Sequence, residues 1–253
     1  GNPHVRFDEG EVASEKPRPL LYSKRKFALT LLLGASVVCG KQVAWATKTF
    51  EFAAGETTGY IDDSARWTGS GADCLCNSSG TILVTNGVSW AASGAFFIFG
   101  STDALATTVV RVLSGGSVSS SQGLRPGWTK DTYGVLIAES GGTLQGGGWS
   151  VGASGYGIVT NSGALKVNGP LKLGGEKAAT GEGIWVHNTA TDNVFTNPKD
   201  LYVGVLGRGE LIVNDGYEFW WRYYSHNGNG DVIVGQSQQD NKIVLNPGSS
   251  FRA

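Results

Sequence analysis

The feature that most constrains the fold of this chain is the way its apolar residues are interrupted. From residue 47 onward they alternate at i and i+2 in short runs, and Gly, Asn, Asp or Ser bounds each run. This pattern indicates short strands joined by turns rather than helices. Gly accounts for 39 of the 253 residues, and each Gly in a helix interior costs up to about 1 kcal/mol. The sequence therefore predicts an all-β fold.

Two phrases recur within this region. In the first, a small residue precedes two aliphatic residues at alternate positions and then a glycine. In the second, a bulky residue and an aliphatic or aromatic one precede a glycine. One such strand cannot bury its apolar face alone, but stacked copies can, with neighbouring backbones about 4.8 Å apart. The first phrase occurs at 80–87, 209–216, 241–248 and, one residue shorter, 163–169; the second occurs at 97–100, 149–152, 201–204 and 232–235.

These repeats predict a right-handed parallel β-helix, which is a solenoid. A propeller would need four strands in each blade and a blade signature. Three short strands with their turns need roughly 20–25 residues, so residues 47–253 would form about nine coils. Strand alternation predicts that one set of aliphatic side chains points inward, namely Leu211, Val213, Ile243 and Leu245.

The N-terminal part has the order of a secretory signal. The basic residues Lys24–Lys26 precede an uncharged apolar run at 27–40, and Ala44 and Ala46 form a small-x-small cleavage site. The run is shorter than the ~20 residues that cross a bilayer. We therefore predict a disordered leader or frame-start artefact at 1–23, a signal peptide at 24–46 cleaved after Ala46, and a β-helical domain at 47–253.

Several classes of chemistry find no support in the sequence. The formal net charge is −1, and no basic cluster follows the signal, so we expect no nucleic-acid partner. Neither a serine-hydrolase elbow nor a cluster of carboxylates is present, so we expect no catalytic residues and no enzyme activity. Cys74 and Cys76 fall short of the four ligands of structural zinc. We expect no metal or cofactor, and a cysteine pair that is inert or joined locally.

A stretch of dense aromatic residues at 217–224 is the candidate binding region. In a strand, neighbouring side chains point to opposite faces. One set would pack as a ladder in the core, and the other would form an exposed patch that captures a protein or a glycan. The sequence leaves open which set faces outward. The first set is Tyr217, Phe219, Trp221 and Tyr223, and the second is Trp220, Arg222 and Tyr224.

The chain resembles the passenger domain of a Gram-negative autotransporter of the adhesin-like type. The resemblance rests on the signal, on the Gly-rich repeats with few cysteines, and on two phrases similar to passenger-associated repeats. It covers most of 47–253, but its motifs are specific only in the last fifty residues or so. The two phrases are VGVLGRGELIVNDG at 203–216 and VGQSQQDNKIVLNPGSSF at 234–251.

This resemblance implies export to the cell surface, the outer membrane or the medium, with a structural or adhesive role in virulence. A truncated chain would stay in the periplasm. It further implies a monomer that binds a host-cell protein or glycan, and a translocation barrel in a C-terminal part missing here. The alternative is a glycan-active lyase or hydrolase on the same scaffold, because a fold does not decide a function.

Overall fold

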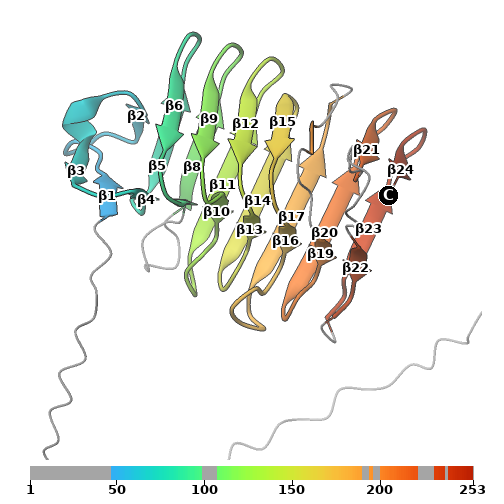
Figure 1. Ribbon diagram of the computed structural model, residues 1–253. Helices are drawn as coiled ribbons and strands as arrows, with labels where there is room; N and C mark the ends of the chain where they lie inside the picture. Colours follow the sequence, from blue (N-terminus) through green and yellow to red (C-terminus); the bar gives the residue numbers. More distant parts are fainter. Residues whose placement is uncertain are drawn as a thin grey trace, which may run out of the picture. The chain divides into compact units, whose positions relative to one another are not determined.

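Parallel strands, stacked coil upon coil, form almost all of the regular structure (Figure 1). The chain is thus a parallel β-helix, as the sequence predicts, and the described residues contain no α-helix. One 3₁₀ turn, η1 (Ser64–Arg66), interrupts the strands. The leader 1–23 and the signal peptide 24–46 lie outside the described residues. The computed structural model describes residues 47–98, 107–189, 194–195, 200–221, 231–236 and 239–252.

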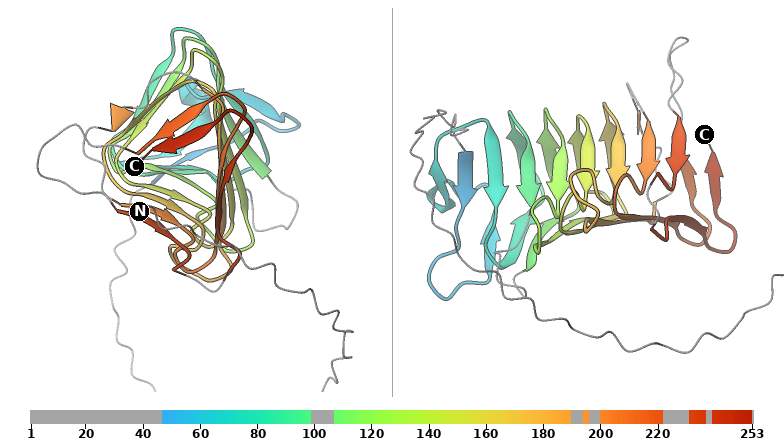
Figure 2. Two further views of the ribbon diagram at one scale, coloured as in Figure 1. Left: turned by 90° about the vertical axis from the view of Figure 1, so that its right-hand side faces the viewer. Right: turned by 90° about the horizontal axis from the view of Figure 1, so that it is seen from below.

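Three faces surround the core, and each coil contributes one strand to each face. Face 1 consists of two sheets that meet where β10 contacts β13. Seen along the axis, the strands of a face nearly superpose (Figure 2). Face 1 comprises β1 (Thr47–Phe50), β4 (Asp73–Cys76), β7 (Phe96–Ile98), β10 (Leu124–Pro126), β13 (Trp149–Val151), β16 (Leu171–Leu173), β19 (Leu201–Val203) and β22 (Val232–Val234).

Face 2 is one continuous sheet, whereas face 3 is a five-stranded sheet followed by a two-stranded one. Face 2 comprises β2 (Thr58–Tyr60), β5 (Gly80–Val84), β8 (Thr107–Val112), β11 (Tyr133–Ala138), β14 (Tyr156–Asn161), β17 (Glu182–His187), β20 (Arg208–Val213) and β23 (Lys242–Leu245). Face 3 comprises β6 (Ser89–Ala92), β9 (Ser117–Ser120), β12 (Thr143–Gly146), β15 (Ala164–Val167), β18 (Val194–Phe195), β21 (Glu218–Trp220) and β24 (Ser250–Arg252).

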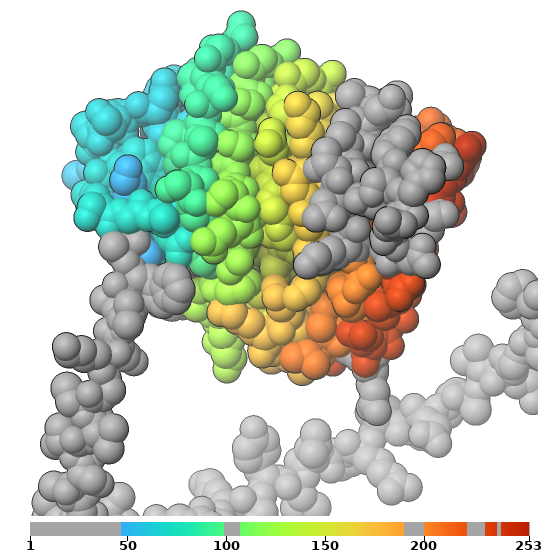
Figure 3. All heavy atoms as spheres, in the orientation of Figure 1, coloured from blue at the N-terminus to red at the C-terminus, as the bar shows by residue number. Residues whose placement is uncertain are grey.

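The register of face 2 shows how much chain each coil uses. Gly134 pairs with Gly157, which pairs with Gly183, which pairs with Gly209. Along this face the register advances by 23 to 32 residues from one coil to the next. Coils are therefore longer than the expected 20–25 residues, and face 2 has eight strands rather than nine. The successive coils lie side by side as bands (Figure 3).

Aromatic residues cover the first coil. Strand β3 (Trp67–Gly69) pairs antiparallel with β1, the reverse of the parallel pairing in the other coils. Phe50 is fully buried, and its ring meets the rings of Phe52 and Trp67 edge-on at 5.3 Å. These contacts exclude water from the start of the core, as the antiparallel strand folds over it.

Aliphatic side chains in register fill the core. On face 2, Leu211 and Val213 are fully buried, which confirms that they point inward. Ile243 pairs with Leu211 and packs, partly buried, against the core. Leu245 pairs with Val213, but its side chain is 49% exposed. The prediction that Leu245 is buried was wrong, because β23 is the last strand of its sheet and only one coil covers it.

The repeated phrases occupy equivalent places in the coils. Three copies of the first phrase are β5, β20 and β23 of face 2, whereas the shorter copy is β15 of face 3. The described copies of the second phrase end at glycines with positive φ after β13, β19 and β22. At Gly152 a Cβ atom would lie 1.9 Å from the carbonyl oxygen of Glu182. Only glycine fits there, because the turn needs a left-handed backbone and packs against the next coil.

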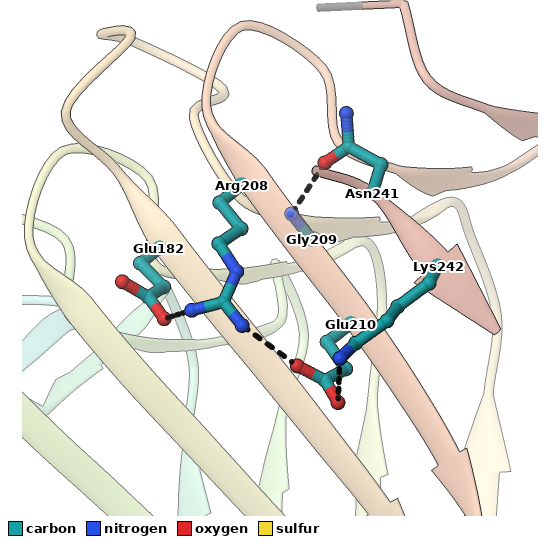
Figure 4. A network of polar contacts seen from close by, with 6 residues as sticks. All are labelled: Glu182, Arg208, Gly209, Glu210, Asn241 and Lys242. Atoms are coloured by element: carbon teal, nitrogen blue, oxygen red, sulfur yellow. Dashed lines mark hydrogen bonds and ion pairs between the residues drawn. The ribbon is translucent and has the colours of Figure 1, made fainter. Parts of the chain in front are cut away.

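A row of alternating charges crosses the outside of face 2 (Figure 4). Arg208 binds Glu182 on one coil and lies 3.1 Å from Glu210 on its own strand. Lys242, on the following coil, lies 3.3 Å from Glu210. Each exposed pair contributes about 0–1 kcal/mol. Opposite charges on neighbouring strands nevertheless favour this register over a shifted one.

Candidate functional site

The aromatic stretch divides by strand parity. Phe219 is fully buried, Trp221 is 3% exposed, and Tyr217 packs half-buried against the core. Phe219 stacks on Phe251 of the following coil, with ring centroids 5.9 Å apart and planes 7° from parallel. The set that begins with Tyr217 therefore contributes a ladder of core aromatics. Its remaining member, Tyr223, lies outside the described residues.

Trp220 represents the opposite parity. Its Nε1–H donates a hydrogen bond of 2.6 Å to Glu218, and the guanidinium of Arg252 lies 4.8 Å from its ring. Arg222 and Tyr224 belong to the same set but lie outside the described residues. The proposal that this set binds a partner stays a prediction.

A groove on the outside of face 1 is the best-formed candidate site. Its floor is a row of outward side chains that the parallel register aligns on successive coils. Leu75 of β4 pairs with Phe97 of β7, and Phe97 pairs with Arg125 of β10. The groove encloses about 510 Å³. Its lining residues are Thr47, Asp73, Leu75, Ala95, Phe97, Gln122, Arg125, Trp128 and Lys177.

Two turns supply the groove's remaining aromatic and cationic side chains. Trp128 follows Gly127, whose φ of +67° lets the chain turn directly after β10. Lys177 lies in the turn after β16, where its N–H donates a 2.9 Å hydrogen bond to the carbonyl of Ala153. The turn residues are therefore fixed by backbone bonds between coils.

Trp128 organises the charges of the groove. The guanidinium carbon of Arg125 lies 4.4 Å from the Trp128 ring and 5.3 Å from the Phe97 ring. The ammonium of Lys177 lies 3.8 Å from the Trp128 ring. The rings of Phe97 and Trp128 are 5.4 Å apart. Because cations are attracted to aromatic faces, these contacts hold both positive groups in place beside an apolar floor.

The electrostatics of the groove are those of a site with excess positive charge. Burial lowers the pKa of Arg125, and burial together with the charge of Arg125 lowers the pKa of Lys177. Asp73 also lines the groove, where its Oδ1 accepts a 2.8 Å hydrogen bond from the Ala95 N–H. Glu176 lies nearby and forms a 2.8 Å ion pair with Lys172, which lowers its pKa.

The predicted cysteine pair lies on the other side of the same sheet. Cys74 and Cys76 are both buried and free, two positions apart in β4, so their side chains share the core face. Burial raises the pKa of Cys74 to about 11 and also raises that of Cys76. Both remain thiols at neutral pH, and thiols are poor nucleophiles and poor metal ligands.

Two further searches covered only the described part of the chain. No group of three or more His, Cys, Asp or Glu side chains is placed to hold a metal ion there. Nor does any helix in that part have the length and apolar character that a membrane span requires.

The fold and the groove define a parallel β-helix with a lateral groove lined by aromatic and cationic residues. Comparison with protein-family models, with curated proteins and with solved structures found no match in any of the three.

Sequence analysis did not identify the groove. Leu75, Phe97, Arg125 and Lys177 are spread over about a hundred residues and share no motif. They meet only because the parallel register places one position of each coil beside the same position of the next. Phe97 was the one available signal, since it opens a copy of the second repeated phrase on face 1.

Proposed function

We propose that this chain is an exported β-helical surface protein with an adhesive role, and that it binds a glycan through the groove on face 1. The observation that carries the proposal is the arrangement of Arg125 and Lys177 around Trp128, beside the apolar floor formed by Leu75 and Phe97. Ligand sites typically combine a concave apolar surface with a few fixed polar groups.

A sugar ring matches both parts of this surface. Its C–H faces are apolar and would pack on the floor, while its hydroxyls would bind the polar side chains at the rim. Asp73 is a hydrogen-bond acceptor, Gln122 is both donor and acceptor, and Arg125 is a donor. The groove crosses three coils, so it is open along the axis of the solenoid and suits a chain of sugars.

The autotransporter part of the proposal has separate support. The two phrases that resemble passenger-associated repeats form β20 and β23, which pair in register on face 2. A stack of parallel coils is compatible with a passenger domain. The order of basic, apolar and small residues at 24–46 supports export.

The test is binding of the purified chain to an array of neutral and acidic oligosaccharides. Trp128→Ala removes the ring that positions both cations, and we expect the affinity to fall about tenfold or more. Trp220→Ala is the matched control, because it removes a tryptophan that lies on face 3. Circular dichroism of both variants verifies that the coils remain folded.

Three results would contradict the proposal. The first is the absence of any glycan binding. The second is loss of binding in Trp220→Ala but not in Trp128→Ala, which would assign adhesion to the aromatic stretch. The third is release of new sugar ends during incubation, which would favour the glycan-active enzyme.

A further inference from the structure

We propose that the groove on face 1 selects anionic saccharides, and that Arg125 and Lys177 bind a carboxylate or sulfate group carried by the sugar. This inference rests on the proposed glycan-binding function and adds the charge of the ligand. Phe97 and Leu75 would contact the apolar face of the same sugar. Trp128 acts as a positioning residue, since it holds both cations next to that floor.

The balance of charge around the groove supports an anionic ligand. Among the described residues, neither Arg125 nor Lys177 has a carboxylate within ion-pair distance. The carboxylate of Glu176 is already paired with Lys172, 2.8 Å away. Asp73 is then the one acidic group that lines the groove, against two cations. An anion between Arg125 and Lys177 would leave the groove close to neutral.

The two cations also disfavour each other in the empty groove. Burial is the largest cause of the lowered pKa of Lys177, and the charge of Arg125 is the second. Burial likewise lowers the pKa of Arg125. A bound anion would offset both costs, because an opposite charge within a few ångströms stabilises the charged form of each group. A guanidinium binds carboxylate and sulfate oxygens in a forked geometry, to which an ammonium adds a point charge.

A saccharide fits this surface better than a nucleic acid does. Nucleic-acid sites track a backbone with many Lys and Arg side chains, whereas this groove has two cations and the whole chain carries a formal net charge of −1. The floor also offers the aliphatic Leu75 and Ala95, which suit the C–H face of a sugar ring. The acceptor Asp73 would repel a phosphate backbone but can bind a sugar hydroxyl.

Three tetramers that differ at one atom position test the charge of the ligand. They are a β-1,4-linked glucose tetramer, the tetramer of glucuronate with the same linkage, and the glucose tetramer sulfated at C6. Calorimetric titration of the full chain measures each affinity. We expect the anionic tetramers to bind at least tenfold more tightly than the neutral one, which is the size of one charge-assisted hydrogen bond. We also expect that preference to weaken as salt is raised.

Variants assign the preference to the two cations. Arg125→Gln and Lys177→Gln should each reduce the affinity for the anionic tetramers about tenfold and leave that for the neutral tetramer within twofold. Lys166→Gln is the matched control, because Lys166 is an exposed lysine on β15 of face 3. Lys177 is itself exposed in a turn, so its variant should fold even if Arg125→Gln does not.

The outcomes separate this inference from the function on which it rests. Equal affinity for all three tetramers, with binding still lost in Trp128→Ala, overturns the anionic ligand and retains the glycan site. No binding of any sugar overturns both. Preference for the glucuronate alone, or for the glucuronate and the sulfated tetramer together, supports the inference and distinguishes a carboxylate site from a site for either anion.

Discussion

The buried histidine of β17 should make the stability of the β-helix depend on pH. His187 is fully buried, and its Nε2–H donates a 3.1 Å hydrogen bond to the carbonyl of Glu218. Its ring lies edge-on to Phe219, with centroids 5.1 Å apart. This apolar setting favours the neutral imidazole. Burial lowers the pKa of His187 from 6.5 to about 4, although bonds to the backbone of Glu218 and Thr189 oppose the shift.

The sign and size of the effect follow from proton linkage. Between pH 6.5 and about 4 the unfolded chain binds a proton at His187 that the folded chain does not. The free energy of unfolding therefore falls as the pH falls through this window, and is unaffected by this group above pH 6.5. A shift of this size costs about 3 kcal/mol when the pH reaches the folded pKa.

Urea unfolding at a series of pH values measures this loss. His187→Gln removes the titrating group, so its stability should vary less with pH between 6.5 and 4 than that of the unaltered chain. Acidic side chains titrate in both proteins, so the difference between the two curves isolates the imidazole. Two curves that run parallel throughout this window would refute the assignment of the shift to His187.

Three further predictions concern the core, the turns and export. Leu211→Ala should lower the free energy of unfolding by about 2–5 kcal/mol, and Leu245→Ala by clearly less, because its side chain is 49% exposed; equal losses in urea unfolding would contradict this. Gly174→Ala should destabilise more than Gly235→Ala in thermal unfolding, since a Cβ would lie 2.0 Å from the Arg208 carbonyl at the first site and meet nothing within 4 Å at the second. Export should yield a product that N-terminal sequencing shows to be cleaved after Ala46, and a product that retains residues 27–40 would contradict the signal.

The sequence predicted the stacking of the coils better than their number. The copies of the first phrase at β5, β20 and β23 lie on one face with their aliphatic residues in register. Equivalent strands β14 and β17 escaped notice, because polar residues occupy an inward position in each, Asn161 and His187. Alternation of apolar residues cannot reveal an inward position that is polar. Turn length was the other source of error, since turns between faces carry residues that no periodicity constrains.

The candidate sites differ in how far a sequence can reveal them. The aromatic stretch is contiguous, so its division by parity was predictable, and Phe219 and Trp220 follow it. The groove is assembled from Phe97, Arg125 and Lys177 on separate coils, and only the register brings them together. A sequence gives no register before the length of each coil is known, which is why the groove required the structure.

The pairing of each coil with its immediate neighbour has a consequence for how such a chain can change length. The register steps from Gly134 to Gly157 and on to Gly183, so every strand of face 2 has its partners one coil away, however many coils there are. Removal of the 26 residues from 157 to 182 would bring Gly183 beside Gly134 in the same register, with Trp185 following Leu136 in the core. Loss or duplication of whole coils therefore preserves the contacts of the rest, because stability in a solenoid is a sum over neighbouring repeats. Deletions of any other length would shift the inward residues out of alignment, so sequences of this kind can lengthen or shorten only in steps of one coil.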